Sequence, residues 1–210
     1  SNLWKQAIKW PLYTVVIIPI FLMGSFNLYL FGNIPILKFI LFNCAALLIL
    51  LWENLTNDLF DSSTGVDKFK LHSVVNLIKN KKIISFIAYT SLLIGLLIIY
   101  YIANSKGFEG FLLVCGCCIL GYLYQGPPFR LGYLGLGEPL CWLAFGPLAN
   151  AAGLIILNPS QNYGEIPWKE SILLGSGPSL AITLVLFCSH FHQIEEDKKF
   201  GKISPLVRIG

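Results

Sequence analysis

The sequence predicts an all-α fold, a polytopic transmembrane helix bundle with six spans. Of its 210 residues, 55% are hydrophobic and only 12% are charged, whereas soluble domains carry about 25% charged residues. Apolar stretches of about 20 residues, the length that crosses a bilayer as a helix, recur along the chain. Because lipid cannot satisfy backbone polar groups, each stretch is expected to be helical. We therefore expect one membrane domain over 1–210.

The predicted spans follow one another with short polar connections. Segment 12–31 comes after Lys5 and Lys9, is long enough to cross a bilayer, and lacks a small-residue cleavage site. It is therefore interpreted as the first span, not as a signal peptide. The second span, about 37–56, carries one charge, Lys38, near its start. The other four spans are predicted at 83–103, about 110–127, 139–157 and 171–189.

Positive charges are distributed unequally between the two sides of such a bundle. Six spans place both chain ends and the loops 54–82 and 125–138 on one side, which holds twelve of the fifteen Lys and Arg residues. This side is therefore predicted to face the cytoplasm, or the stroma in a plastid. Eight of the eleven acidic residues lie there too. Acidic residues contribute little to orientation, so their clustering calls for a chemical explanation.

A first acidic motif, "ENLTNDLFD", occupies residues 53–61 at the end of the second apolar stretch. Asn54, Asp58 and Asp61 stand at positions i, i+4 and i+7, so a helix would present them on one face. Two carboxylates and an amide oxygen are ligands that suit Mg²⁺, which commonly bridges to phosphate oxygens. The alternative is a helix end that water solvates at the membrane surface.

A second acidic motif, "HFHQIEEDKKFGKISPLVRIG", follows the sixth span. Gln193 and Asp197 are four residues apart, and Glu196 lies one turn from Gln193. Both acidic motifs are followed by lysines, so they are interpreted as two arms facing one cavity. There the acids would hold Mg²⁺ and the cations would neutralise a diphosphate. The alternative is a solvated loop. The candidate lysines are Lys68, Lys70, Lys198 and Lys202.

Between the arms lies the loop 122–139, "YLYQGPPFRLGYLGLGEP", in which Gly and Pro interrupt any helix. Tyr122, Tyr124 and Tyr133 supply hydroxyls amid apolar surface. Arg130 is the sole cation of this loop and is predicted either to bind diphosphate or to anchor the loop at the headgroups.

Cysteine and histidine give no sign of a metal site. All six cysteines fall in apolar segments and are predicted to pack as small residues without disulfides. His190 and His192 are two residues apart and would point apart on a helix.

The three polar stretches together resemble the UbiA superfamily of intramembrane prenyltransferases, particularly its 1,4-dihydroxy-2-naphthoate prenyltransferases. "NLTNDLFDSSTGVDKFKLHSVVNL" resembles the first Asp-rich motif of the family, "GPPFRLGYLGLGEP" its middle loop and "HFHQIEEDKKFGKISPLVRIG" its second Asp-rich motif. Gln193, which brings no charge, stands where the family often has Asp. The superfamily fold has about nine transmembrane helices, so the resemblance implies a chain truncated at its C-terminal end.

The resemblance implies an enzyme that uses Mg²⁺. Asp58, Asp61 and Asp197 would be catalytic, and an aromatic acceptor would lie near Tyr122, Tyr124 and Gln193. The implied metal ligands are Asn54, Asp58, Asp61, Glu196 and Asp197. The implied diphosphate-binding residues are Asn54, Lys68, Lys70, Arg130, Lys198 and Lys202.

The implied reaction transfers a phytyl or polyprenyl group from its diphosphate to 1,4-dihydroxy-2-naphthoate, with loss of CO₂ and diphosphate. This step belongs to phylloquinone or menaquinone synthesis. It takes place in the lipid bilayer and involves no nucleic acid. Homogentisate phytyltransferase and chlorophyll synthase are alternatives within the superfamily. An ion or solute transporter is an alternative of another class, although transporter sites tend to lie near the bilayer midplane. A non-catalytic scaffold would leave the paired motifs unexplained.

Overall fold

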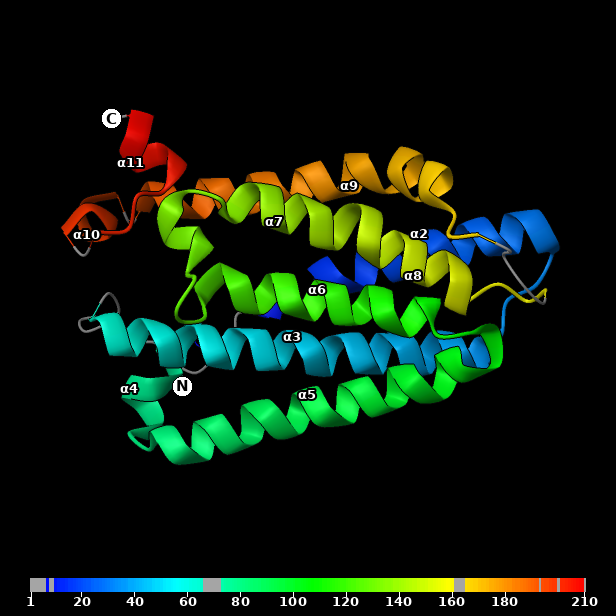
Figure 1. Cartoon of the computed structure of the whole chain (residues 1–210), viewed down its shortest axis with the longest axis horizontal. Helices are drawn as coiled ribbons and strands as arrows, with labels where there is room; N and C mark the ends of the chain where they lie inside the picture. The colour runs from blue at the N-terminus through cyan, green and yellow to red at the C-terminus, as the bar shows by residue number, and fades with distance from the viewer. Residues whose placement is uncertain are drawn as a thin grey trace.

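The computed structural model describes residue 7 and residues 10–65, 73–160, 165–192, 194–199 and 201–209, and within these ranges every regular element is helical (Figure 1). The longer helices are α2 (Thr14–Phe31), α3 (Ile36–Thr64), α5 (Lys81–Ala103), α6 (Glu109–Gln125) and α9 (Trp168–Ser189). The shorter elements are η1 (Trp10–Tyr13), α4 (Val74–Ile78), η2 (Asn104–Lys106), η3 (Leu131–Leu134), α7 (Gly137–Leu143), η4 (Ala144–Leu148), α8 (Ala149–Ile156), η5 (His190–His192), α10 (Ile194–Lys199) and α11 (Pro205–Ile209).

The described residues contain five helical segments that are long and apolar enough to cross a membrane. They are Thr14–Phe31, Ile36–Thr64, Lys81–Lys106, Gly137–Ile156 and Trp168–Ser189. These confirm the predicted all-α membrane bundle and five of its six spans. The remaining predicted span is α6, an apolar helix of 17 residues. At 1.5 Å per residue it is about 25 Å long, at the lower limit for a helix that crosses a bilayer.

Helix α3 extends two turns beyond its predicted span and carries the whole first acidic motif. It ends at Gly65, whose φ of 85° suits glycine and whose N–H donates to the Asp61 carbonyl oxygen. Asn54, Asp58 and Asp61 therefore share one continuous helix with the apolar residues that precede them. The predicted helical spacing of the motif is confirmed.

The fifth span is interrupted, although the sequence predicts one helix over 139–157. It consists of α7, the π-helical turn η4 and α8. Pro147 lies inside η4 and has no N–H to donate. The Trp142 carbonyl oxygen, five residues before Pro147, accepts instead from Ser179 Oγ on α9 at 2.8 Å. The Asn150 side chain adds hydrogen bonds to the carbonyl oxygens of Phe145 at 2.9 Å and Gly146 at 2.7 Å. The wider turn brings the η4 residues Ala144 and Phe145 to the central cavity described below.

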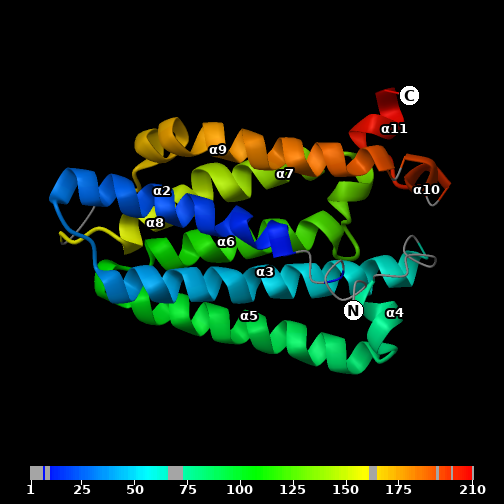
Figure 2. The ribbon, with the colours of Figure 1, turned by 180° about the vertical axis from the view of Figure 1, so that it is seen from behind.

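The long helices lie side by side along the long axis of the molecule, with α3 between α5 and α6 (Figure 1). Seen from behind, α2 lies on the face opposite α7 (Figure 2). The C-terminal end of α3 gathers at one end of the bundle with α4, α10, α11 and the connection between α6 and α7. The fold thus brings the two acidic motifs and the middle loop to the same end.

Replacing Gly95 with Ala is expected to lower the thermal stability of the bundle, because α5 packs closely against α3 at this glycine. A Cβ at Gly95 would lie 2.9 Å from Ile49 Cγ1 and 3.1 Å from the Ala45 carbonyl oxygen. We expect a cost of about 1–3 kcal/mol, measured by thermal unfolding in detergent. Gly116→Ala on α6 is the matched control, since its Cβ would meet only Leu148 Cδ1 at 3.6 Å. Equal stability of the two variants would contradict the packing argument.

Candidate active site

A cavity of about 430 Å³ runs between α2, α3, α6, α7 and α9. Its α2 wall is apolar and includes Val15, Val16, Pro19 and Ile20. Polar side chains of α3, α6, η5 and the C-terminal segment also reach it. They are Glu53, Asn54, Asn57, Asp58, Asp61, Tyr124, Gln125, His190 and Lys202. The cavity therefore has both an apolar wall and a group of polar, charged side chains, as an amphipathic ligand requires.

One face of α3 forms the longest wall of this cavity. Phe42, Ala46, Ile49 and Leu50 provide its apolar part, and the acidic motif 53–61 continues the same wall toward the end of the helix. The apolar part and the acidic motif form one continuous surface because residues three and four positions apart lie on the same face of a helix. The structure thus places the predicted site residues Asn54, Asp58 and Asp61 together on the cavity wall.

Asp61 is the centre of a hydrogen-bond network between three elements. Its Oδ1 accepts hydrogen bonds from Gln125 Nε2 on α6 and from the Tyr133 hydroxyl on η3, both at 2.9 Å. The Tyr133 hydroxyl also lies 2.8 Å from Thr64 Oγ1. Burial and the nearby Asp61 carboxylate raise the pKa of Tyr133, so its hydroxyl remains a donor at neutral pH. The network orients Asp61 and ties the middle loop to α3.

Asp58 is held from the other side of the site. The backbone N–H of Val74, the first residue of α4, donates to Asp58 Oδ2 at 2.8 Å. This bond satisfies one of the backbone donors that the start of a helix leaves unpaired. Asp58 is 4% exposed and Asp61 8%, so both carboxylates are largely removed from bulk water.

The second arm reaches the cavity through Lys202. Its Nζ lies 3.7 Å from Asp197 Oδ1 and 5.6 Å from the centre of the Tyr133 ring. The backbone reinforces this arrangement, because Lys202 N–H donates to the Asp197 carbonyl oxygen and Ile203 N–H to that of Tyr133. Asp197 itself is fully buried and is not among the residues that line the cavity. The structure therefore presents Lys202 to the cavity and places Asp197 behind it.

Arg130 lies beside the end of α3 and is not among the residues that line the cavity. Its Nη2 donates to Ser63 Oγ at 3.2 Å, and its Cζ lies 5.8 Å from the centre of the Tyr133 ring. Its φ of 45° is unusual for a residue with a side chain and carries a strain that surrounding contacts must hold.

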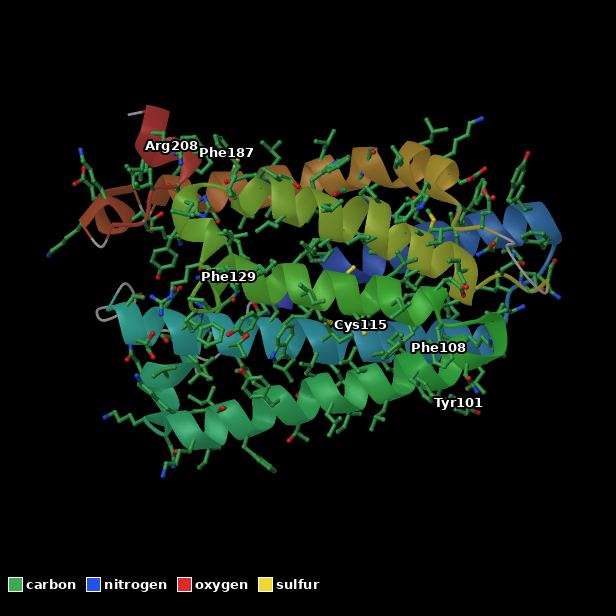
Figure 3. All side chains as sticks on the ribbon, in the orientation of Figure 1. Tyr101, Phe108, Cys115, Phe129, Phe187 and Arg208 are labelled. Carbon is green, nitrogen blue, oxygen red and sulfur yellow. The ribbon has the colours of Figure 1, made fainter. Side chains whose placement is uncertain are left out.

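Figure 3 shows Phe129 and Arg208 at the end of the bundle that holds the C-terminal end of α3, and Tyr101 and Phe108 at the opposite end. Arg208 binds the middle loop, because its Nη2 donates to the Leu134 carbonyl oxygen.

Four of the predicted site residues that the structure describes do not line the cavity: Tyr122, Lys198, Arg130 and Asp197. The hydroxyl of Tyr122 donates to the Pro127 carbonyl oxygen, and its ring packs edge-on against Phe60. Tyr122 lies about 200° around α6 from Tyr124, so only Tyr124 can face the cavity from this helix. Lys198 is exposed on α10 and does not line the cavity either. Lys68, Lys70 and Gln193 fall outside the described residues, as does the side chain of Glu196.

The motif-based prediction missed Gln125 and Tyr133 as partners of Asp61. The sequence contained one signal for each, since both belong to the helix-breaking loop beside Arg130. Hydrogen-bond partners 64 and 72 residues away, however, could not be paired from local spacing. Asn57 and Glu53 were missed because the spacing argument began at Asn54, although both belong to the same helical wall.

The donor set of this site fits Mg²⁺ in the company of a phosphate ligand. Within the described ranges, no group of three or more His, Cys, Asp and Glu side chains is arranged to hold a metal ion unaided. Mg²⁺ usually takes one or two protein carboxylates, with substrate phosphates and water completing its shell. Asp58 and Asp61, with the amides of Asn54 and Asn57, offer such a partial shell. All six cysteines are free thiols, in agreement with the predicted absence of disulfides.

Replacing His190 with Gln is expected to flatten the pH dependence of thermal stability between about pH 6.5 and 4. Burial and the Lys202 charge lower the pKa of His190 from 6.5 to about 4 and outweigh Glu138 Oε1, which lies 3.4 Å from His190 Nδ1. The unfolded chain therefore takes up this proton first, and stability is lost as the pH falls through this range. The test measures the unfolding temperatures of the wild type and of His190→Gln in detergent across this pH range. Parallel curves would contradict it.

Comparisons with known proteins agree on one family. The chain matches the UbiA prenyltransferase family over residues 16–210. It is 43% identical over its whole length to 2-carboxy-1,4-naphthoquinone phytyltransferase of Synechocystis, and 39% identical over 99% of its length to the chloroplastic Arabidopsis enzyme of that name. It spans 66% and 55% of these two relatives. It is 24% identical over 94% of its length to Bacillus subtilis 1,4-dihydroxy-2-naphthoate octaprenyltransferase, of which it spans 62%. No solved structure was found to match it.

Proposed function

Because the chain belongs to the UbiA prenyltransferase family, we propose that the whole protein transfers a prenyl group from an allylic diphosphate to a naphthalene-type acceptor in quinone synthesis. The phytyl group and 1,4-dihydroxy-2-naphthoate are the substrates that we assign to it. The names of the relatives support both the prenyl transfer and the bicyclic acceptor. The observation that carries the proposal is one cavity that joins an apolar wall to the acidic end of α3.

The diphosphate is assigned to the acidic end of the cavity. Mg²⁺ held there by Asn54, Asp58 and Asp61 would supply positive charge to the leaving group. Lys202 lines the cavity, and Arg130 donates to Ser63, two residues beyond Asp61, so both are assigned to offset further phosphate charge. Asn54 lines the cavity beside the two carboxylates, and its Nδ2 could donate to a phosphate oxygen. Asp197 would contribute by holding Lys202 or by reaching the metal directly.

The transfer itself needs little from the protein beyond placement and the exclusion of water. The allylic C–O bond breaks, and its electron pair leaves with the diphosphate. The ring carbon that carries the carboxylate bonds to the allylic carbon. The carboxylate then departs as CO₂, and the electron pair of its C–C bond restores the aromatic ring. The attacking ring must be electron-rich, which the dihydroxy form is and the quinone is not.

The cavity walls suit a developing allylic cation. Phe42, Trp52, Tyr124 and Phe145 line the cavity, and ring faces attract positive charge. The apolar side chains of α2 would surround the prenyl chain. The predicted cytoplasmic or stromal location of the acidic end follows from the distribution of Lys and Arg and forms part of the proposal.

The test uses the full-length protein in membranes supplied with phytyl diphosphate and 1,4-dihydroxy-2-naphthoate. Mass spectrometry should find the decarboxylated, phytylated naphthalene product when Mg²⁺ is present and lose it when EDTA is added. Homogentisate and chlorophyllide serve as competing acceptors in parallel reactions. Transfer to either of these in place of the naphthoate would assign another acceptor. Solute flux in sealed vesicles without any transfer product would instead favour a transporter.

A further inference from the structure

Glu53 brings a second carboxylate region to the cavity, deeper than the Asp-rich end. It precedes Asn54 on α3 and lines the same cavity. It lies five positions before Asp58 and eight before Asp61, which correspond to about 7.5 Å and 12 Å along the helix axis. The Glu53 backbone therefore lies between the predicted diphosphate site and the apolar α3 residues Leu50 and Ile49.

The surroundings of Glu53 form a small, distinct corner between α3, α6 and α7. A Cβ on Gly121 of α6 would lie 3.4 Å from Glu53 Cδ and Oε1, so the carboxyl group packs directly on the bare backbone of this glycine. The thiols of Cys117, Cys118 and Cys141 line the cavity from the same two helices.

The carboxylate of Glu53 makes no hydrogen bond and no ion pair within the part of the chain that the structure describes. Asp58 and Asp61, by contrast, accept hydrogen bonds from named donors. An ionisable group inside a membrane cavity is costly unless a partner satisfies it, and such groups commonly mark a ligand site. A hydrogen-bond donor on a ligand in the cavity would give the Glu53 carboxylate a partner.

We propose that Glu53 binds the aromatic acceptor, with its carboxylate accepting a hydrogen bond from a ring hydroxyl in the corner between α3, α6 and α7. This inference rests on the proposed function. The allylic carbon is bonded to the diphosphate, so it lies just beyond the Asp-rich end. The attacking ring carbon must approach within about 3–3.5 Å of it. An acceptor ring in that position extends to the depth of Glu53.

The same contact gives Glu53 a role in substrate selection. A dihydroxy ring can donate to the carboxylate, whereas the corresponding quinone has only acceptor oxygens and would leave Glu53 unpaired. Sites built to bind a hydroxyl discriminate strongly against analogues that lack it. Glu53 therefore favours the reduced acceptor, the form that can attack the allylic carbon.

The test compares Glu53→Ala and Glu53→Gln with the wild-type full-length enzyme. We expect Glu53→Ala to raise the acceptor KM about 10- to 100-fold, the effect of losing a hydrogen bond to a charged group. The KM for phytyl diphosphate should stay within about twofold, because uniform loss of acceptor binding leaves the donor site intact. Glu53→Gln retains an accepting oxygen and should recover part of the loss. Glu109→Gln, which removes an exposed carboxylate at the start of α6, is the matched control.

A binding measurement separates this inference from the proposed function. Trp52 lines the cavity, so quenching of tryptophan fluorescence by 1,4-dihydroxy-2-naphthoate without donor reports acceptor binding. Glu53→Ala should weaken this binding and Glu109→Gln should not. Unchanged acceptor binding and KM in a folded Glu53→Ala protein would overturn the assignment. If that variant does not fold, unchanged acceptor binding and KM in Glu53→Gln overturn it. Absence of transfer by the wild type, with acceptor binding that still depends on Glu53, would refute the proposed reaction alone.

Discussion

Asp61→Asn is expected to lower kcat/KM for prenyl transfer about 100- to 1,000-fold, the range found when a group that stabilises developing charge is removed. Asparagine keeps the shape of the side chain and one carbonyl oxygen, which can still accept from Gln125 Nε2 and the Tyr133 hydroxyl. The charge that would hold Mg²⁺ beside the diphosphate is lost. The measurement is a kinetic assay of the full-length enzyme at several Mg²⁺ concentrations, with thermal unfolding to confirm the fold.

Tyr133→Phe is the control for this substitution. It removes the hydroxyl that donates to Asp61 Oδ1 and leaves the carboxylate in place. We expect a loss of about tenfold, in keeping with one hydrogen bond to a charged group. Near-normal turnover of Asp61→Asn at saturating Mg²⁺ would show that Asp61 is not a metal ligand. A Tyr133→Phe defect as large as that of Asp61→Asn would assign Asp61 to loop positioning instead.

Asp197→Ala is expected to reduce both stability and transfer, and the two losses have separate causes. Asp197 is fully buried beside Lys202, whose own exposure is 4%, so removing the carboxylate leaves a buried ammonium without its counter-charge. Breaking such a pair costs about 3–5 kcal/mol. We expect transfer to fall at least about 100-fold, because Lys202 is then no longer held where it can meet a diphosphate.

The double variant Asp197→Ala/Lys202→Met distinguishes the two causes. Removing both charges should restore most of the lost stability, since an apolar pair can replace a buried ion pair. Transfer should remain low, because the cavity still lacks the Lys202 cation. Thermal unfolding and transfer assays of Asp197→Ala, Lys202→Met and the double variant complete the cycle. An Asp197→Ala protein of wild-type stability would contradict the structural role. Recovery of transfer in the double variant would show that Lys202 is not needed for the diphosphate.

The sequence by itself determined the helical membrane bundle and the fact that Asn54, Asp58 and Asp61 share one face of α3. Apolar stretches of spanning length have few stable alternatives to a helix in lipid, so they predict the elements well. The spacing of Asn54, Asp58 and Asp61 is a local property of one helix, and the structure places them on one cavity wall. The break in the middle loop likewise follows from the Gly and Pro residues within it.

Only the tertiary structure decided which side chains from separate helices meet. The bonds of Gln125 and Tyr133 to Asp61 depend on how α6 and η3 pack on α3, which local spacing does not encode. The same packing turned Tyr122 toward Phe60, placed Asp197 behind Lys202, and left Glu53 facing the cavity. At the π-turn, the Trp142 carbonyl oxygen accepts from Ser179 Oγ on α9, a contact that only helix packing provides. Helix formation is governed by contacts a few residues apart, whereas the site depends on contacts between segments that lie far apart in the chain.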